Sequence, residues 1–80
     1  MTRLKLLYFA SMRDVAQVAG ETVETEAASL SSLYEELQIR HQFILPREQL
    51  RVAVDGAFAK WEDAPRDGNE VAFIPPVSGG

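Results

Sequence analysis

Eighty residues predict a single domain with a small core, because a chain this short buries only about 60–65% of its unfolded surface. The formal net charge of −4 argues against a nucleic-acid partner, since phosphate backbones select basic surfaces. The absence of cysteine excludes disulfides, thiolate metal ligands, cysteine nucleophiles and cysteine persulfides.

The first predicted element is a strand over Arg3–Phe9, whose apolar residues on both faces indicate a central place in a sheet. Its basic and then apolar start is too short for a secretory signal peptide, so we expect a cytoplasmic protein. A short helix follows over Ala10–Ala19, and Gly20 is expected to end it. Glu21–Glu26 alternates and is rich in β-branched residues, which predicts an exposed strand protected by acidic side chains.

The main helix is predicted over residues 29–41. Its apolar residues recur at the spacing of one helical face: Leu30, Leu33, Tyr34 and Leu37. Ser29 is the expected N-cap, with Ser31 and Ser32 as alternatives. His41 is expected on the surface, favourably placed at the negative end of the helix.

A β-hairpin is predicted next, with strands Arg51–Val54 and Ala57–Trp61 joined by a two-residue Asp55-Gly56 turn. This register places Phe58 on the less buried face of the sheet. A polar turn region precedes the last strand, Glu70–Ile74. Together these elements predict an α+β fold in which one main helix packs on a mixed sheet.

The body of the chain offers no expected catalytic site. His41 is the only histidine, which excludes a catalytic triad or a multi-histidine metal site within one chain. Asp67-Gly68-Asn69 is too short for a phosphate-binding loop, and Glu24-Thr25-Glu26 and Glu35-Glu36 are interpreted as solvated faces. We therefore expect no metal, no bound cofactor and no catalysis by the isolated chain.

The end of the chain carries the strongest functional signal. Beyond a globular body of residues 1–74, six residues form a protruding tail: Pro75, Pro76, Val77, Ser78, Gly79 and Gly80. The two prolines stop the sheet, and the glycines lack the Cβ atoms that would block a narrow channel. Six extended residues span roughly 20 Å. The terminal carboxylate is ionised and resists nucleophiles until adenylation by ATP on a partner enzyme supplies a leaving group.

Residues 67–80 resemble the C-terminal signature of the small subunit of molybdopterin synthase, above all in the run Val71–Gly80. Leu7-Tyr8-Phe9-Ala10 followed by Arg13 also resembles that family, so the similarity covers essentially the whole chain. The resemblance implies a ubiquitin-like β-grasp fold and a sulfur-carrier role in molybdenum cofactor synthesis.

The same resemblance implies the chemistry and the partners. An ATP-dependent, ubiquitin-activating-type enzyme would adenylate Gly80, and a sulfurtransferase system would convert it to a thiocarboxylate. The tail would then enter the large synthase subunit and deliver sulfur to cyclic pyranopterin monophosphate. The expected assembly contains two small and two large subunits.

Strand alternation also predicts a docking patch beside the tail, because Ile74 falls on the same face as Phe58. Arg13 is a further candidate for a contact with an acidic partner. The alternative is that the chain's own loops cover Phe58 or Ile74. For function, the residues leave open a carrier for thiazole or tRNA thiolation, a modifier that joins Gly80 to lysines, and a plain binding module.

Overall fold

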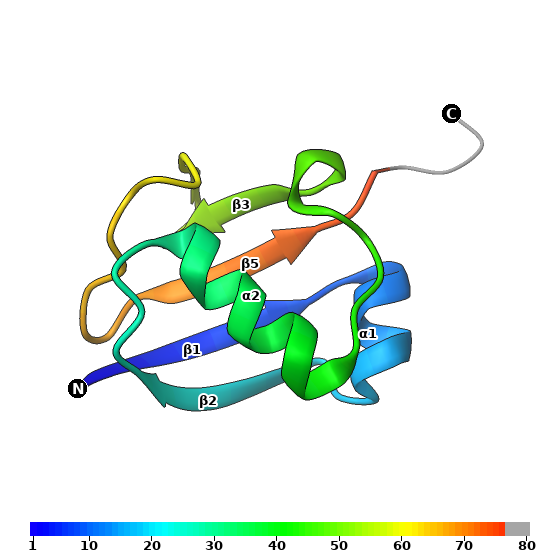
Figure 1. Ribbon diagram of the computed structural model, residues 1–80, viewed down its shortest axis with the longest axis horizontal. Coiled ribbons are helices and arrows are strands. Elements are labelled where there is room, and N and C mark those ends of the chain that lie inside the picture. The colour runs from blue at the N-terminus through cyan, green and yellow to red at the C-terminus, as the bar shows by residue number, and fades with distance from the viewer. Residues whose placement is uncertain (77–80) are drawn as a thin grey trace.

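The computed structural model describes residues 1–76, which build a mixed sheet with one long helix across one face (Figure 1). The strands are β1 (Thr2–Tyr8), β2 (Gly20–Thr25), β3 (Arg51–Val54), β4 (Ala57–Phe58) and β5 (Glu70–Ile74). The helices are α1 (Ala10–Ala16) and α2 (Leu30–His41), and a 3-10 turn, η1, spans Arg47–Gln49. This arrangement confirms the predicted α+β class.

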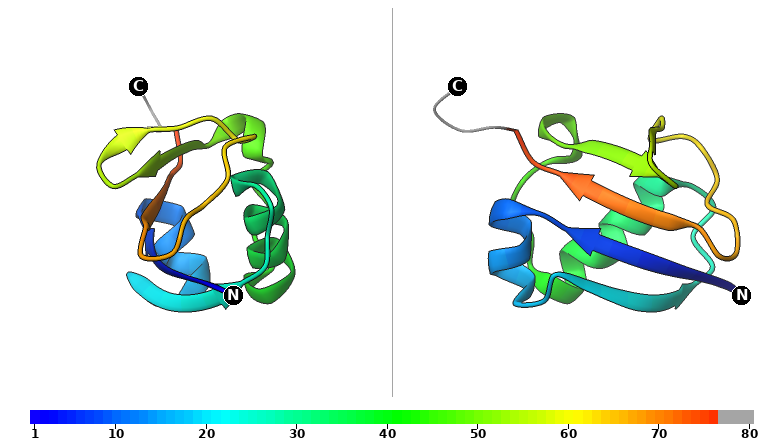
Figure 2. Two further views of the ribbon diagram at one scale, coloured as in Figure 1. Left: turned by 90° about the vertical axis from the view of Figure 1, so that its left-hand side faces the viewer. Right: turned by 180° about the vertical axis from the view of Figure 1, so that it is seen from behind.

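The strands lie in the order β2-β1-β5-β3-β4, so the last strand of the chain occupies the centre of the sheet. β5 pairs in parallel with β1 and antiparallel with β3, as the rear view in Figure 2 shows. The predicted central position of the first strand is confirmed, and β2 is an edge strand. In the β3–β4 hairpin Val54 lies opposite Ala57, which confirms the predicted Asp55-Gly56 turn.

The core lies between α2 and the inner face of the sheet. The predicted apolar stripe of α2 is buried throughout: Leu30, Leu33, Tyr34 and Leu37. Phe73 of β5 is fully buried, and its ring centroid lies 5.6 Å from that of Tyr34 and 6.3 Å from those of Tyr8 and Trp61. These aromatic contacts join α2 to the two central strands.

The start of α2 is anchored by its own cap and by a distant loop. The Ser29 hydroxyl accepts a hydrogen bond from the Ser32 amide at 3.1 Å, which confirms Ser29 as the N-cap. The amides of Leu30 and Ser31 donate to the carbonyls of Asp63 and Trp61, each at 2.9 Å. The loop after β4 thus satisfies helix amides that would otherwise lack partners.

The prediction that Gly20 ends the first helix is wrong. Gln17 ends α1 in the left-handed conformation (φ 65°), and its amide donates to the carbonyl of Arg13 at 2.8 Å. Gly20 instead begins β2 beside β1, where an added Cβ would lie 2.8 Å from the Leu6 carbonyl oxygen. The close approach of β1 and β2 therefore explains why a residue without a Cβ stands at position 20.

The expectation that His41 lies on the surface is also wrong. Its ring packs against Tyr8 and Phe43, and its side chain is 14% exposed. His41 Nε2 lies 2.6 Å from a carboxylate oxygen of Glu21, and the Tyr8 hydroxyl donates to the same oxygen at 2.5 Å. Arg40 lies 3.7 Å from the other oxygen of Glu21. This half-buried polar cluster ties β1, β2 and the end of α2 together.

One residue of the segment interpreted as solvated is likewise buried. Thr25 is 4% exposed, and its hydroxyl donates to Glu36 at 2.7 Å and accepts from the Ala27 amide at 3.0 Å. The neighbouring acidic side chains, Glu24 and Glu26, are exposed as predicted.

We predict that Glu21→Ala lowers the free energy of unfolding by about 1–3 kcal/mol, because it leaves the Tyr8 hydroxyl and the His41 ring without their shared acceptor. Glu24→Ala on the same strand is the matched control and should cost less than about 1 kcal/mol, since it removes only an exposed ion pair with Arg3. Urea unfolding monitored by circular dichroism measures both. Equal losses would contradict a structural role for the cluster.

We also predict an acid-dependent contribution from Glu21. Burial opposes its ionisation, but hydrogen bonds from Tyr8 and His41 and the charges of His41 and Arg40 outweigh burial and hold the pKa of Glu21 below 4.5. A lowered folded-state pKa gives stability that is present above 4.5 and lost as the pH falls through the lower value. The stability difference between wild type and Glu21→Ala should therefore shrink on acidification below about pH 5. A constant difference down to acid unfolding would refute this.

Candidate functional site

The tail leaves the sheet at the end of its central strand (Figure 1). Arg51 and Ile74 form the last pair between β3 and β5, after which Pro75 is buried and Pro76 is exposed. Neither proline can donate a ladder hydrogen bond, so strand pairing stops here, as predicted. Four predicted tail residues lie outside the described part of the chain: Val77, Ser78, Gly79 and Gly80.

One hollow lies at the root of the tail, and a second lies beside Phe58. One, of about 280 Å³, is lined by Glu48, Gln49, Leu50, Arg51, Ile74, Pro75 and Pro76. The other, of about 320 Å³, is lined by Glu48, Leu50, Arg51, Val52, Phe58, Ala59 and Trp61. The segment from η1 to the start of β3 contributes to both, so its position shapes the surface around the tail.

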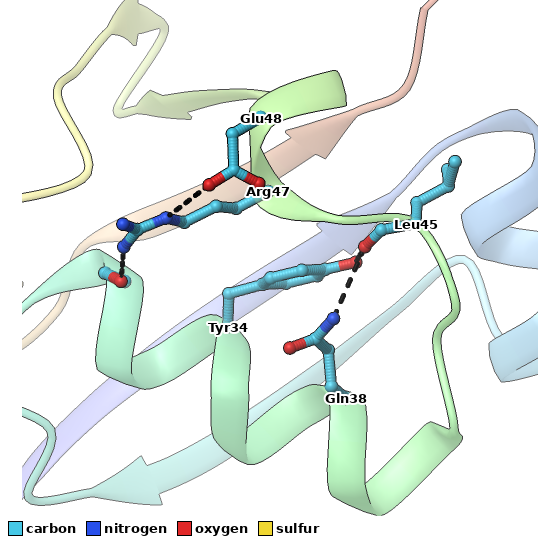
Figure 3. A network of polar contacts seen from close by, with 6 residues as sticks. Tyr34, Gln38, Leu45, Arg47 and Glu48 are labelled. Carbon is cyan, nitrogen blue, oxygen red and sulfur yellow. Dashed lines mark hydrogen bonds and ion pairs between the residues drawn. The ribbon is translucent and has the colours of Figure 1, made fainter.

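A polar network holds that segment against α2 (Figure 3). The Tyr34 hydroxyl donates to the Leu45 carbonyl at 2.7 Å, and burial raises the pKa of Tyr34 to about 12, so the phenol remains a donor at neutral pH. Gln38 donates to the same carbonyl at 3.4 Å. Arg47 donates to the Ser31 hydroxyl and lies 3.4 Å from Glu48. Side chains of α2 therefore hold in place the segment that shapes the surface beside the tail.

The outer face of the sheet carries the predicted docking residues. Ala53 pairs with both Ala72 and Phe58, and directly opposed residues share a face, so Phe58 and Ile74 lie on the same side. Phe58 is 68% exposed, whereas Ile74 is half-buried. The structure thus brings the two side chains to one face but exposes Ile74 less than expected.

Arg13, the third predicted docking residue, lies on a different element. It is exposed on α1, which packs against β1 and β5. The structure gives it no contact with Phe58 or Ile74 among the hydrogen bonds and ion pairs of residues 1–76. A docking role for Arg13 stays a prediction.

Arg51 is a surface residue that the sequence reasoning did not single out. Its guanidinium carbon lies 5.4 Å from the centroid of the Phe58 ring, within the range of a cation–π contact. The predicted hairpin register implies that Arg51 and Phe58 share one face, because Arg51 and Ala53 lie on the same side of β3 and Phe58 lies opposite Ala53. That register was the signal that could have identified Arg51.

Comparison with known proteins gives the family. The model of the ThiS family matches residues 6–80. A molybdopterin synthase sulfur carrier subunit of Chlamydomonas reinhardtii is 35% identical, with 98% of this chain and 99% of the relative covered. The subunit of the same name from Haemophilus influenzae is 31% identical, with 96% and 99% covered.

Solved structures agree with this assignment. A protein described as molybdopterin converting factor, subunit 1, from Pyrococcus furiosus is 30% identical, with a TM-score of 0.81 over 96% of this chain and 100% of that one. The SAMP1 protein of Haloferax volcanii is 25% identical, with a TM-score of 0.83 over 98% and 99%.

A third structure shares the fold at lower identity. It is the complex of subunits 1 and 2 of the molybdopterin-converting factor from Helicobacter pylori, in which the matching chain is 18% identical, with a TM-score of 0.69 over 99% and 100%. With a ubiquitin-like β-grasp fold and a family match from Leu6 to Gly80, the chain belongs to the ThiS family and resembles its molybdopterin synthase sulfur carrier subunits.

Proposed function

We propose that this chain is the sulfur-carrying small subunit of molybdopterin synthase and that Gly80 is its reactive residue. The observation that carries the proposal is the Pro75–Gly80 tail, which follows directly from a strand held at the centre of the sheet. The curated relatives named as sulfur carrier subunits support it, since they match the chain over almost its full length.

The proposed chemistry begins with activation of the terminal carboxylate. A carboxylate oxygen of Gly80 attacks the α-phosphorus of ATP on a ubiquitin-activating-type partner, and pyrophosphate leaves. A sulfide-level sulfur nucleophile from a donor system then attacks the carbonyl carbon, and AMP leaves with its bonding electrons. The product is a thiocarboxylate at Gly80. ATP is consumed on the partner, so the chain itself needs no bound cofactor.

The second step delivers the sulfur. Residues 75–80 enter the large synthase subunit, where the thiocarboxylate sulfur attacks a carbon of cyclic pyranopterin monophosphate and displaces an oxygen substituent of that carbon. Water then cleaves the acyl carbon–sulfur bond of the resulting thioester, which restores the carboxylate of Gly80 and leaves the sulfur on the product. Slim residues at the end of the tail suit a narrow channel. A large subunit as partner is supported by the Helicobacter pylori complex, whose small chain shares this fold, and we propose an assembly of two small and two large subunits.

The outer face of the sheet would dock these partners. Phe58 is a large exposed apolar side chain on the face from which the tail leaves, and Ile74 lies on the same face at the root of the tail. Apolar and aromatic anchors of this kind dominate the affinity of many interfaces. Arg13 would add a peripheral contact from α1. A cytoplasmic location stays part of the proposal.

A second candidate function is protein modification, in which activated Gly80 forms an isopeptide bond with a lysine. The similarity to SAMP1 of Haloferax volcanii favours it, because that protein is named small archaeal modifier protein 1. Both functions share the adenylation step and differ in the nucleophile that follows.

We predict that intact protein from its own cells contains a fraction heavier by the exchange of one oxygen for one sulfur at Gly80. Intact mass spectrometry followed by fragmentation of the C-terminal peptide locates the sulfur. A variant without Gly79-Gly80 is the control and should carry none. Unmodified protein accompanied by lysine-linked conjugates would replace the carrier with the modifier.

We predict that Phe58→Asp weakens binding to the large subunit by about tenfold or more while the domain stays folded, because the side chain is an exposed anchor rather than core. Ile44→Asp is the matched control, since Ile44 is 91% exposed in the connection after α2. Isothermal titration calorimetry measures the affinity, and circular dichroism checks the fold. Equal affinities for the two variants would remove Phe58 from the interface.

A further inference from the structure

We propose that Arg51 supplies the ionic contact of the docking face, the outer sheet face that carries Phe58 and Ile74. Its guanidinium binds a carboxylate side chain of the large subunit, close to the point where the tail enters that subunit. The inference rests on the proposed function and adds the partner chemistry that this face recognises. It assigns Arg51 a role in specificity, separate from the apolar anchor Phe58.

The position of Arg51 is the first argument. It begins β3 directly opposite Ile74, the last residue of β5 before the tail, and it lines both the hollow at the root of the tail and the hollow beside Phe58. Its guanidinium carbon lies 5.4 Å from the centroid of the exposed Phe58 ring. Any protein surface that covers Phe58 and receives the tail must therefore also cover Arg51.

The second argument is that Arg51 has no acidic partner within residues 1–76. Several basic side chains do have one: Arg3 with Glu24, Lys5 with Glu70, Arg40 with Glu21 and Arg47 with Glu48. Glu48, which lines the same hollows, lies 3.4 Å from Arg47. Arg51 is exposed and forms no ion pair in the described part of the chain.

If the large subunit covered the Arg51 guanidinium without supplying an acidic group, the loss of hydration would weaken binding. Removing a guanidinium from water requires a compensating charge with good geometry, and the planar group is suited to a two-point contact with a carboxylate. The neighbouring Phe58 ring restricts the side chain, so less conformational freedom is lost on binding. A surface complementary to this face therefore presents a carboxylate at Arg51.

Chain length identifies the anion as a side chain of the partner rather than a phosphate of the activation reaction. A fully extended chain of the length of Pro75–Gly80 would span roughly 20 Å. The adenylated carboxyl group in an extended tail is thus beyond the reach of an arginine side chain that starts opposite Ile74. Arg51 lies at the root of the tail, so the group of the partner that meets it belongs to the surface around the tail and not to the reaction site at Gly80.

The test compares Arg51→Gln and Arg51→Glu with Arg66→Glu, a charge-matched control in the exposed loop before β5. Each full-length variant is titrated into the purified large subunit by calorimetry at low and high salt. We expect Arg51→Gln to weaken binding roughly tenfold, Arg51→Glu to weaken it further, and Arg66→Glu to change it less than about twofold. The salt dependence of binding should also fall in Arg51→Gln.

Two results would overturn the inference. Arg51→Glu could bind the large subunit as tightly as Arg66→Glu does. Alternatively, Arg51→Glu could keep its affinity for the large subunit but lose thiocarboxylation in cells, which would place the contact on the activating enzyme. In both cases wild-type binding and the sulfur mass shift would still support the proposed function, whereas the absence of both in wild type would refute that function itself.

Discussion

Burial of Phe73 is the constraint on which the rest of the structure depends. Its ring is fully buried among Tyr8, Tyr34 and Trp61, which come from β1, α2 and the segment after β4. Because β5 also pairs on both sides, its end cannot shift without disturbing the core and two ladders at once. The root of the tail is therefore attached to a strand held by the core and by both neighbouring strands, and it has a defined position relative to the outer face of the sheet.

The two faces of the sheet have different chemistry because strand side chains alternate. Val71 and Phe73 point to α2 and are fully buried, whereas Ala72 and Ile74 point away from it. On this outer face Phe58 is the large apolar residue with the most exposed side chain among those that oppose β3, at 68%. One side of the sheet thereby stabilises the fold, and the other is available for recognition, which allows binding residues to change with little effect on the core.

Local signals were sufficient to predict α2, its Ser29 cap and the Asp55-Gly56 hairpin, because each depends on residues a few positions apart. The misread features depend on partners distant in sequence or on unusual backbone conformations. Nothing local marks His41 as buried, since its acceptor Glu21 lies 20 residues earlier. Gln17 ends α1 with a positive φ that is more typical of glycine. The proposal of a reactive end at residues 77–80 rests on the sequence alone.

The parallel pairing of β1 with β5 has a consequence for how the protein is made. Lys5 lies opposite Glu70 and Tyr8 opposite Phe73, so nearly the whole chain separates strands that are neighbours in the sheet. Synthesis proceeds from the N-terminus, and β1 therefore waits for its central neighbour until Glu70–Ile74 have been made. The sheet closes only when β5 emerges. A chain that terminates before β5 lacks the central strand, so β1 and β3 have no neighbour between them and the sheet cannot form.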